Sequence, residues 1–285
     1  MIGRQSPLIT MIMPYFGQLP EWIDIYFETC RWNDSIDYVF FTDAGPLGGE
    51  LPPNVSIVPM TLAEFNQLYC SRFPDRRPIE HPYKICDIRP GYGILFREYI
   101  RDCPFFGWGD VDVVYGDVAG YLTPDMLSAD VISFNRRHIS GHLTIARTSC
   151  AHKLPVSFPS WTDRVDYPDY HLDEPRSLNS LDLFAAESFN TPLSPLIPWT
   201  NGEFIFPNEW YWRAGSLTND LDGDRMFPYL HFMHWKGGEW PRACGNARWE
   251  KLPSVVSLRR EQIASGFRVN SQGFFPFKGE GASCG

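Results

Sequence analysis

Short runs of apolar residues alternate with a helix-like segment over the first 60 positions of the chain. The runs at 8–13, 36–41 and 55–60 have the continuous apolar character of strands that are buried on both faces of a parallel sheet. Between the first two runs, the apolar residues of 22–30 recur with a period close to that of an α-helix. A strand, a helix and a strand in so short a segment predict a βαβ unit.

The same alternation continues downstream. Thr61 and Glu64 have the spacing of a helix capping box, and the residues that follow favour a helix. A central strand that ends in Asp-Val-Asp is predicted at 105–112 with a second apolar run directly after it, and two further strands are predicted at 131–134 and 142–146. We therefore expect an α/β fold in which a mixed, mostly parallel central sheet is flanked by helices.

The second half of the chain is less regular. Seven prolines interrupt residues 151–200 and preclude long regular elements, which is typical of a lid or a binding loop. Residues 201–217 favour hairpins, and the pattern fades after 245. We expect a single domain over 1–245 and a partly disordered C-terminal extension over 246–285.

Composition narrows the possible partners. The 285 residues are 44% hydrophobic and 21% charged, as in an ordinary globular protein. The aromatic share of 15%, with 10 Trp, is high, and such rings either fill a core or stack on the faces of sugars. Lys and Arg number 25 against 34 Asp and Glu, so the net charge of −9 disfavours a nucleic-acid partner.

The sequence has no pattern typical of a transmembrane helix, a signal peptide or a cysteine-based site. No apolar run approaches the length of about 18 residues that suggests a spanning helix, and the N-terminus lacks the order of a signal peptide. The seven cysteines are scattered without a Cys-x-x-Cys pair, which argues against a zinc site and a disulfide framework. We expect a cytoplasmic protein with reduced thiols and no transmembrane segment.

An Asp-Val-Asp sequence stands between two apolar runs. In an extended segment, alternation places Asp110 and Asp112 on the same side. Two adjacent carboxylates repel each other, and a bound divalent cation such as Mn²⁺ or Mg²⁺ relieves that cost. Similar pairs occur within 220–224, but that segment has the composition of a solvated turn. We therefore favour a metal role for the first pair over a purely structural one.

Ligands of parallel α/β sheets bind outside the carboxyl ends of the strands. That rule makes Tyr15, Phe16 and Asp43 candidates for a nucleotide site, although a turn cap is an equal alternative for Asp43. Lys84 and Asp87, with Arg89, are polar for a segment so close to a predicted core. They either form an internal ion-pair network or order a diphosphate and metal loop, and we favour the second.

Two further segments carry candidate chemistry. The apolar run at 229–235 contains His231 and His234 and leads to Lys236. An imidazole can complete a carboxylate metal site, and Lys binds phosphate as a point charge. Alternation puts the two histidines on opposite faces, so only one is expected to reach the metal, and a satisfied core His is the alternative for each.

The proline-rich loop contains Asp173 and Glu174, flanked by His171 and Arg176. This polar cluster could meet an acceptor hydroxyl, and either carboxylate could act as its base. A salt-bridged loop surface explains the same residues equally well.

Taken together, the ordered motifs resemble a family of poorly characterised bacterial proteins that are classed as glycosyltransferases with the GT-A fold and occur in polysaccharide gene clusters. The resemblance spans roughly residues 8–240 and is carried by Pro-Tyr-Phe-Gly (14–17), Phe-Thr-Asp (41–43), Pro-Tyr-Lys-Ile-Cys-Asp (82–87), Trp-Gly-Asp-Val-Asp (108–112) with Gly-Asp (116–117), Gly-His-Leu-Thr (141–144) and Leu-His-Phe (230–232).

This resemblance implies a metal-dependent hexosyltransferase-type enzyme that moves a sugar from a nucleoside-diphosphate sugar, with a UDP-sugar as the expected donor, to a glycan or other hydroxyl acceptor. Residues 8–120 would form the nucleotide-sugar half and 121–245 the acceptor half. Asp110 and Asp112 match the metal motif, with Asp110 also near the nucleotide, and His231 matches a distal metal ligand.

Lys236 would approach the phosphates and act in catalysis. A His-x-x-Gly-x-x-Lys pattern found in some retaining enzymes of this fold is not matched, because His234 stands at the Gly position and Lys236 is one residue early. Both stereochemical outcomes therefore stay open. The alternatives to a transferase are a non-catalytic carbohydrate-binding protein and, with less support, a metal-dependent phosphohydrolase, which usually needs a denser cluster of ligands.

Overall fold

The computed structural model describes residues 6–45, 49–136, 138–159, 161, 165–167, 177–191, 206–236 and 249–277. The chain divides into two compact units. Unit 1 comprises Met1–Leu19, Asp34–Asp110 and Thr123–Glu187, and unit 2 comprises Pro20–Asn33, Val111–Leu122 and Ser188–Gly285.

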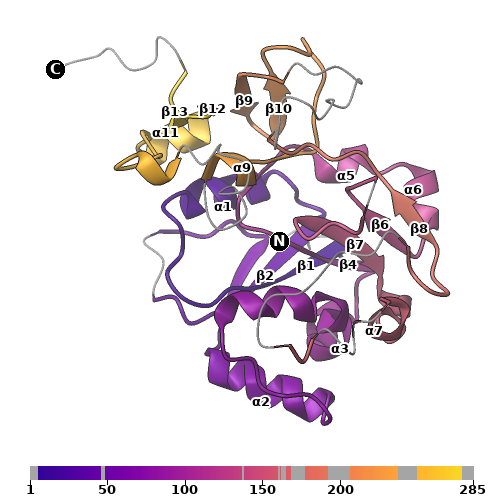
Figure 1. Cartoon of the computed structure of the whole chain (residues 1–285). Coiled ribbons are helices and arrows are strands. Elements are labelled where there is room, and N and C mark those ends of the chain that lie inside the picture. Colours follow the sequence, from indigo (N-terminus) through magenta and orange to yellow (C-terminus); the bar gives the residue numbers. More distant parts are fainter. Residues whose placement is uncertain are drawn as a thin grey trace. The chain divides into compact units, whose positions relative to one another are not determined.

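Unit 1 is built on a seven-stranded sheet in the order β3-β2-β1-β4-β7-β6-β8 (Figure 1). Its strands are β1 (Ile9–Pro14), β2 (Ile36–Thr42), β3 (Val55–Pro59), β4 (Phe105–Gly109), β6 (Val131–Ser133), β7 (Leu143–Arg147) and β8 (Leu183–Ala185). The first four in sequence pair in parallel, β6 pairs in parallel with β8, and β7 is antiparallel to both of its neighbours. The prediction of a mixed, mostly parallel central sheet is confirmed.

The α-helices of unit 1 have four or five residues apart from α2 (Leu62–Arg72). Thr61 begins α2 as predicted, because its hydroxyl accepts a hydrogen bond from the Glu64 backbone N–H while the Glu64 carboxylate accepts one from the Thr61 N–H. The other helical segments of this unit are η1 (Pro82–Gly91), α3 (Tyr92–Leu95), α4 (Arg97–Ile100), α6 (Pro124–Ser128), η2 (Thr148–Cys150) and α7 (Leu154–Ser157).

Helices α2, α3 and α7 lie on one side of the seven-stranded sheet (Figure 1). The core of unit 1 forms there from side chains such as Phe41, Phe65, Phe96 and Trp108, all of them almost fully buried. The rings of Phe41 and Phe96 are 4.1 Å apart between centroids, so strand β2 is packed directly against the α3–α4 segment. This packing fixes the parallel strands whose carboxyl ends carry the candidate residues.

Unit 2 contains α1 (Ile23–Arg31), α5 (Val118–Tyr121) and two small sheets. In the first, β5 (Val113–Tyr115) pairs antiparallel with β11 (Tyr229–His231). The second has the order β10-β9-β12-β13, formed by β9 (Glu209–Arg213), β10 (Ser216–Asn219), β12 (Phe267–Asn270) and β13 (Gly273–Phe275). The remaining helical segments are α9 (Met233–Lys236), η3 (Trp249–Lys251) and α11 (Arg260–Ser265).

Several features of the two units bear on the sequence analysis. The hairpin of β9 and β10 was predicted, whereas β12 and β13 lie where the pattern gave no element. Strand β11 stops at His231 and α9 begins two residues later, so the expectation that strand alternation separates His231 from His234 is wrong. The five cysteines that the structure describes are not joined in disulfides, and the expectation of reduced thiols stays a prediction.

Among the described residues, no helix combines the length and the apolar character that crossing a membrane requires.

Gly107 is expected to be essential for the packing of β4. A Cβ atom at this position would lie 2.5 Å from the backbone oxygen of Thr144 on β7 and 2.8 Å from the Met11 sulfur on β1. Because a backbone oxygen in a sheet cannot move aside, Gly107→Ala should lower the free energy of unfolding by about 1–3 kcal/mol. Urea denaturation measures this, with Gly45→Ala as the control, because a Cβ there meets nothing within 4 Å. Equal losses in both variants would contradict the prediction.

A partly buried carboxylate, that of Glu209, makes the second sheet of unit 2 sensitive to acid. Burial acts to raise the pKa of Glu209, but hydrogen bonds from Arg268, Asn270 and Tyr211 outweigh it and hold the pKa below its ordinary value. A lowered pKa stabilises the fold above the unfolded-state pKa of about 4.3, and this stabilisation is lost as the pH falls through the folded-state pKa.

Glu209→Gln should therefore destabilise the protein at pH 7, and its deficit relative to wild type should shrink below pH about 4. Urea denaturation over this pH range measures the difference, with the exposed Glu261→Gln as the control. A deficit that stays constant with pH would show that the charge of Glu209 contributes nothing.

Candidate metal centre

The chain bends at residues 110–112, between the end of β4 and the start of β5. The sequence analysis expected one extended segment in which alternation aligns the two carboxylates, and that expectation is wrong. Strand β4 ends at Gly109, and the backbone oxygen of Val111 accepts a hydrogen bond of 3.0 Å from the Trp22 indole in unit 2. The positions of Asp110 and Asp112 are therefore set by a bend and by their separate contacts.

Asp110 is the last residue of unit 1 and is held there on two sides. Its backbone N–H donates to the His142 oxygen at 3.2 Å, which continues the β4–β7 pairing by one residue. Its carboxylate pairs with the Arg89 guanidinium, whose side chain is only 7% exposed, whereas that of Asp110 is 31% exposed. Asp110 thus presents a partly open carboxylate beside a fixed positive charge.

Asp112 is buried and carries two partners from unit 2. Its Oδ1 lies 3.4 Å from Nε2 of His231, and its Oδ2 lies 2.7 Å from Nζ of Lys236. Burial acts to raise the pKa of Asp112, but Lys236 and His231 outweigh it and hold the pKa well below its ordinary value. Asp112 is therefore an anion whose charge is balanced inside the protein.

The backbone of His231 is fixed at the end of β11. Its N–H donates to Phe189 and its carbonyl accepts from Thr191, at 2.9 and 2.8 Å. The Nδ1 atom of its ring lies 3.2 Å from Oδ1 of Asn190. An amide oxygen only accepts hydrogen bonds, so an Nδ1–H makes this contact while Nε2 faces Asp112.

The approach of Nε2 to Asp112 has a chemical consequence for the centre. Nε2 and a carboxylate oxygen of Asp112 lie 3.4 Å apart, and when the ring is neutral both atoms are electron-pair donors. Two such atoms repel unless a proton or a metal cation lies between them. A metal-binding imidazole is usually oriented in this way, by an oxygen that accepts a hydrogen bond from its other ring nitrogen.

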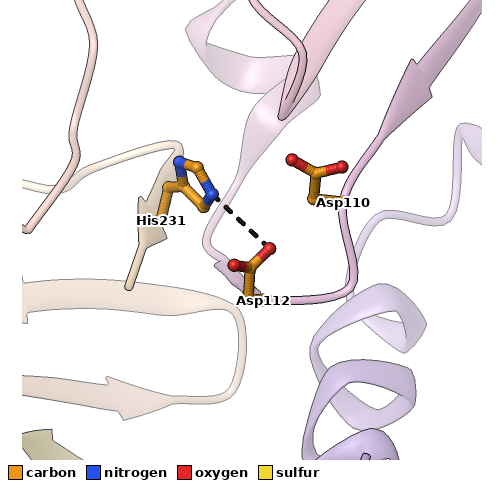
Figure 2. Close-up of side chains that lie close together, drawn as sticks. All are labelled: Asp110, Asp112 and His231. Carbon is orange, nitrogen blue, oxygen red and sulfur yellow. Dashed lines mark ion pairs between the residues drawn. The ribbon is translucent and has the colours of Figure 1, made fainter. Parts of the chain in front are cut away.

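Among the described residues, Asp110, Asp112 and His231 form a group whose potential ligand atoms all lie within 4.8 Å of one another. Figure 2 shows the three side chains, with a dashed line for the Asp112–His231 ion pair. Two carboxylates and one imidazole are oxygen and nitrogen donors of the kind that Mn²⁺ and Mg²⁺ accept. The donor set therefore fits the divalent cation expected from the sequence.

The segment after β11 supplies two more polar side chains. His234 is buried and its backbone N–H donates to Thr191 Oγ1 at 3.1 Å. Burial, reinforced by His231, lowers the pKa of His234 to about 4, so this imidazole is neutral at physiological pH. The group of potential metal ligands includes His231 but not His234. Lys236, on α9, contacts the carboxylate of Asp112.

The candidates at the carboxyl ends of β1 and β2 lie in the connecting loops of unit 1. Asp43 accepts a hydrogen bond of 2.7 Å from the Gly17 N–H, so it caps the loop after β1. Tyr15 donates through its hydroxyl to Gln18, and the ring of Phe16 packs edge-on against Phe65. A nucleotide role for Tyr15, Phe16 and Asp43 remains a prediction.

Lys84 and Asp87 form a buried ion pair of 2.5 Å inside η1, with side chains 3% and 2% exposed. The backbone oxygen of Asp87 also accepts from the Trp161 indole at 2.6 Å. Of the two interpretations of this segment, the internal ion pair is the one that matches the contacts of Lys84 and Asp87. Their proposed part in nucleotide binding remains a prediction.

Two other sets of candidates differ in outcome. Asp173 and Glu174 lie outside the described residues. The acidic segment at 220–224 is a turn, as predicted, because Asp220 accepts hydrogen bonds from the backbone N–H groups of Asn208 and Glu209.

Sequence reasoning missed Asn190 as a contributor to the centre. No motif marks it, because it acts through a single contact with a histidine 41 positions later. The pairing of Arg89 with Asp110 was also unassigned, although the polar character of the segment around Arg89 was noted. The sequence marked Arg89 as unusually polar for its position but did not identify Asp110 as its partner.

Comparison with known proteins adds a family and two solved structures. The chain matches no curated protein. A glycosyltransferase involved in the glycosylation of the major capsid of PBCV-1 is similar over 59% of this chain and 71% of its own, with 11% identity and a TM-score of 0.33. Mouse xyloside xylosyltransferase 1, in its apo form, is similar over 58% and 73%, with 8% identity and a TM-score of 0.29. Residues 11–159, just over half of the chain, match the Family of unknown function (DUF6625), and the chain belongs to that family.

Proposed function

We propose that this protein is a metal-dependent glycosyltransferase that transfers a sugar from a nucleoside-diphosphate sugar, with a UDP-sugar as the expected donor, to a glycan or other hydroxyl acceptor. The observation that carries the proposal is the Asp110, Asp112 and His231 group, with ligand atoms within 4.8 Å of one another. A group of this chemistry suits a divalent cation that binds a diphosphate.

The order of strands in unit 1 supports a nucleotide site next to this group. β2, β1 and β4 are neighbours and run parallel, so their carboxyl ends share one edge of the sheet. Asp43, Tyr15 and Asp110 follow these three strands directly. Ligands of α/β sheets bind at such an edge. A GT-A-like catalytic domain over 1–245 and a C-terminal extension over 246–285 remain part of this proposal.

Each candidate residue would have a separate role in binding the donor. Asp110, Asp112 and His231 would hold Mn²⁺ or Mg²⁺, and a bound cation of this kind supplies charge stabilisation to the departing diphosphate. Lys236 would add its ammonium to the phosphates. Lys84 and Asp87 would keep the segment that carries Arg89 in place, and Arg89 in turn holds Asp110.

The acceptor needs a base only if the reaction inverts the sugar. Asp173 or Glu174 would then take the proton of the acceptor hydroxyl. If the reaction retains the configuration, the departing phosphate can take that proton and no protein base is required. The proline-rich loop at 151–200 would belong to the acceptor half, 121–245, in either case.

Asp112→Asn tests the proposal directly, because it removes one charge and preserves the size of the side chain. We expect this variant to lose turnover and to lose the metal-dependent increase in melting temperature that a nucleoside diphosphate gives the wild type. Thermal unfolding with UDP, GDP and CDP, each with and without Mn²⁺, measures the second effect and identifies the nucleotide.

The matched control is Asp224→Asn, the same chemical change in the exposed Asp-x-Asp pair of the turn. This control should behave as the wild type does. Full activity of Asp112→Asn would overturn the proposal, and stabilisation by glycans that ignores both metal and nucleotide would favour the carbohydrate-binding alternative.

A further inference from the structure

Lys236 already neutralises the carboxylate that the proposed metal needs. Its Nζ lies 2.7 Å from Oδ2 of Asp112, whose side chain is only 4% exposed. A buried carboxylate without a counter-ion is costly, so this ammonium contributes to the stability of the centre in the absence of metal. A cation that binds Asp112 must therefore compete with one that belongs to the protein.

The two carboxylates of the centre carry counter-ions of different mobility. The side chain of Arg89, which pairs with Asp110, is 7% exposed and is thus enclosed by protein. The side chain of Lys236 is 37% exposed and extends from a helix of only four residues. A long, partly exposed lysine can change partners at a small cost, whereas an enclosed guanidinium cannot. Of these two cations, Lys236 is the one suited to exchange.

We propose that Lys236 is an exchangeable internal cation: it occupies Asp112 when the centre holds no metal, and metal binding displaces it toward the diphosphate of the donor. This inference rests on the proposed function and explains how metal binding and nucleotide binding would be coupled. The displaced ammonium repels the divalent cation at short range, and an anionic diphosphate relieves that repulsion by accepting both.

The exchange makes metal and nucleotide binding mutually dependent. Without nucleotide, the metal must break the Lys236–Asp112 pair and leave an ammonium next to a divalent cation, so it binds weakly. With a diphosphate present, the same ammonium gains a new partner and the metal binds more tightly. Linkage requires that the metal strengthen nucleotide binding by the same factor.

Lys236→Met separates this proposal from a simple phosphate-binding role, because Met retains an apolar stem and lacks the charge. Without nucleotide, the variant should bind Mn²⁺ about tenfold more tightly than wild type, a difference of about 1.4 kcal/mol. With Mn²⁺ bound, it should bind UDP more weakly. Titration of Mn²⁺ followed by electron paramagnetic resonance measures the first quantity, and calorimetry measures the second. Lys251→Met, an exposed lysine in η3 of the same unit, is the control.

The outcomes distinguish the inference from the proposed function. If wild type and Lys236→Met bind Mn²⁺ equally, or if the variant binds it more weakly, Lys236 does not compete with the metal and the inference is overturned while the transferase proposal stands. If neither protein binds Mn²⁺ with or without UDP, GDP or CDP, both proposals fail. If only the variant binds Mn²⁺, the competition is confirmed and the metal dependence of the natural enzyme is refuted.

Chemical labelling tests the exchange in the wild-type protein. Acetylation of Lys236 by acetic anhydride, followed by mass spectrometry, should accelerate when Mn²⁺ is added, because the amine leaves its carboxylate, and should slow again when UDP is added. The rate at Lys251 should stay constant. A Lys236 rate that Mn²⁺ leaves unchanged would contradict the displacement.

Discussion

The buried charge of Asp112 is the constraint on which the candidate centre depends. A carboxylate in this position requires compensation, and the protein provides it from a distant part of the sequence. Pairing of β11 with β5 brings His231 next to Val113, one residue after Asp112, and α9 then carries Lys236 to the same carboxylate. The pairing of β5 with β11 therefore brings the groups that compensate the charge of Asp112 to it.

Parallel strand order imposes a second constraint, within unit 1. β1, β2 and β4 are neighbours although 62 residues separate the end of β2 from the start of β4. Their loops therefore meet at one edge of the sheet, where the backbone needs its own partners. Asp43 meets that need by accepting from the N–H of Gly17, and Arg89 holds Asp110 in the same unit. Because a carboxylate has two oxygens, this structural support does not by itself use all of its acceptor capacity.

Sequence pattern was sufficient for the elements that depend on local signals. The strands β1 to β4, the helix α1 and the capping box of α2 follow from apolar periodicity and from two side chains three residues apart. The strands β12 and β13 were missed because they have only four and three residues, and they form by pairing of β12 with β9 and of β13 with β12.

The residue types of the candidate centre were predictable from the sequence, but the contacts that hold these residues in place were not. The residue types of Asp110, Asp112 and His231 pointed to a metal, whereas the argument from alternation failed, because the chain bends at 110–112 and the strand ends at His231. The roles of Asn190 and of the Lys236–Asp112 pair depend on contacts over more than 40 residues, and a single sequence contains no signal for such contacts.

The two kinds of Asp-x-Asp segment in this chain show what gives such a motif its chemical meaning. In the turn, Asp220 is satisfied by backbone N–H groups of Asn208 and Glu209, so its charge completes a local hydrogen-bond pattern. Asp112 is satisfied by an ammonium and faces an imidazole nitrogen, both of which a metal can replace or share. A carboxylate whose partners are cations or lone-pair donors remains available to coordinate a metal. A carboxylate whose partners are backbone amides already has its hydrogen-bonding role in the turn. The partners of a carboxylate, more than its spacing in the sequence, therefore distinguish a metal centre from a turn.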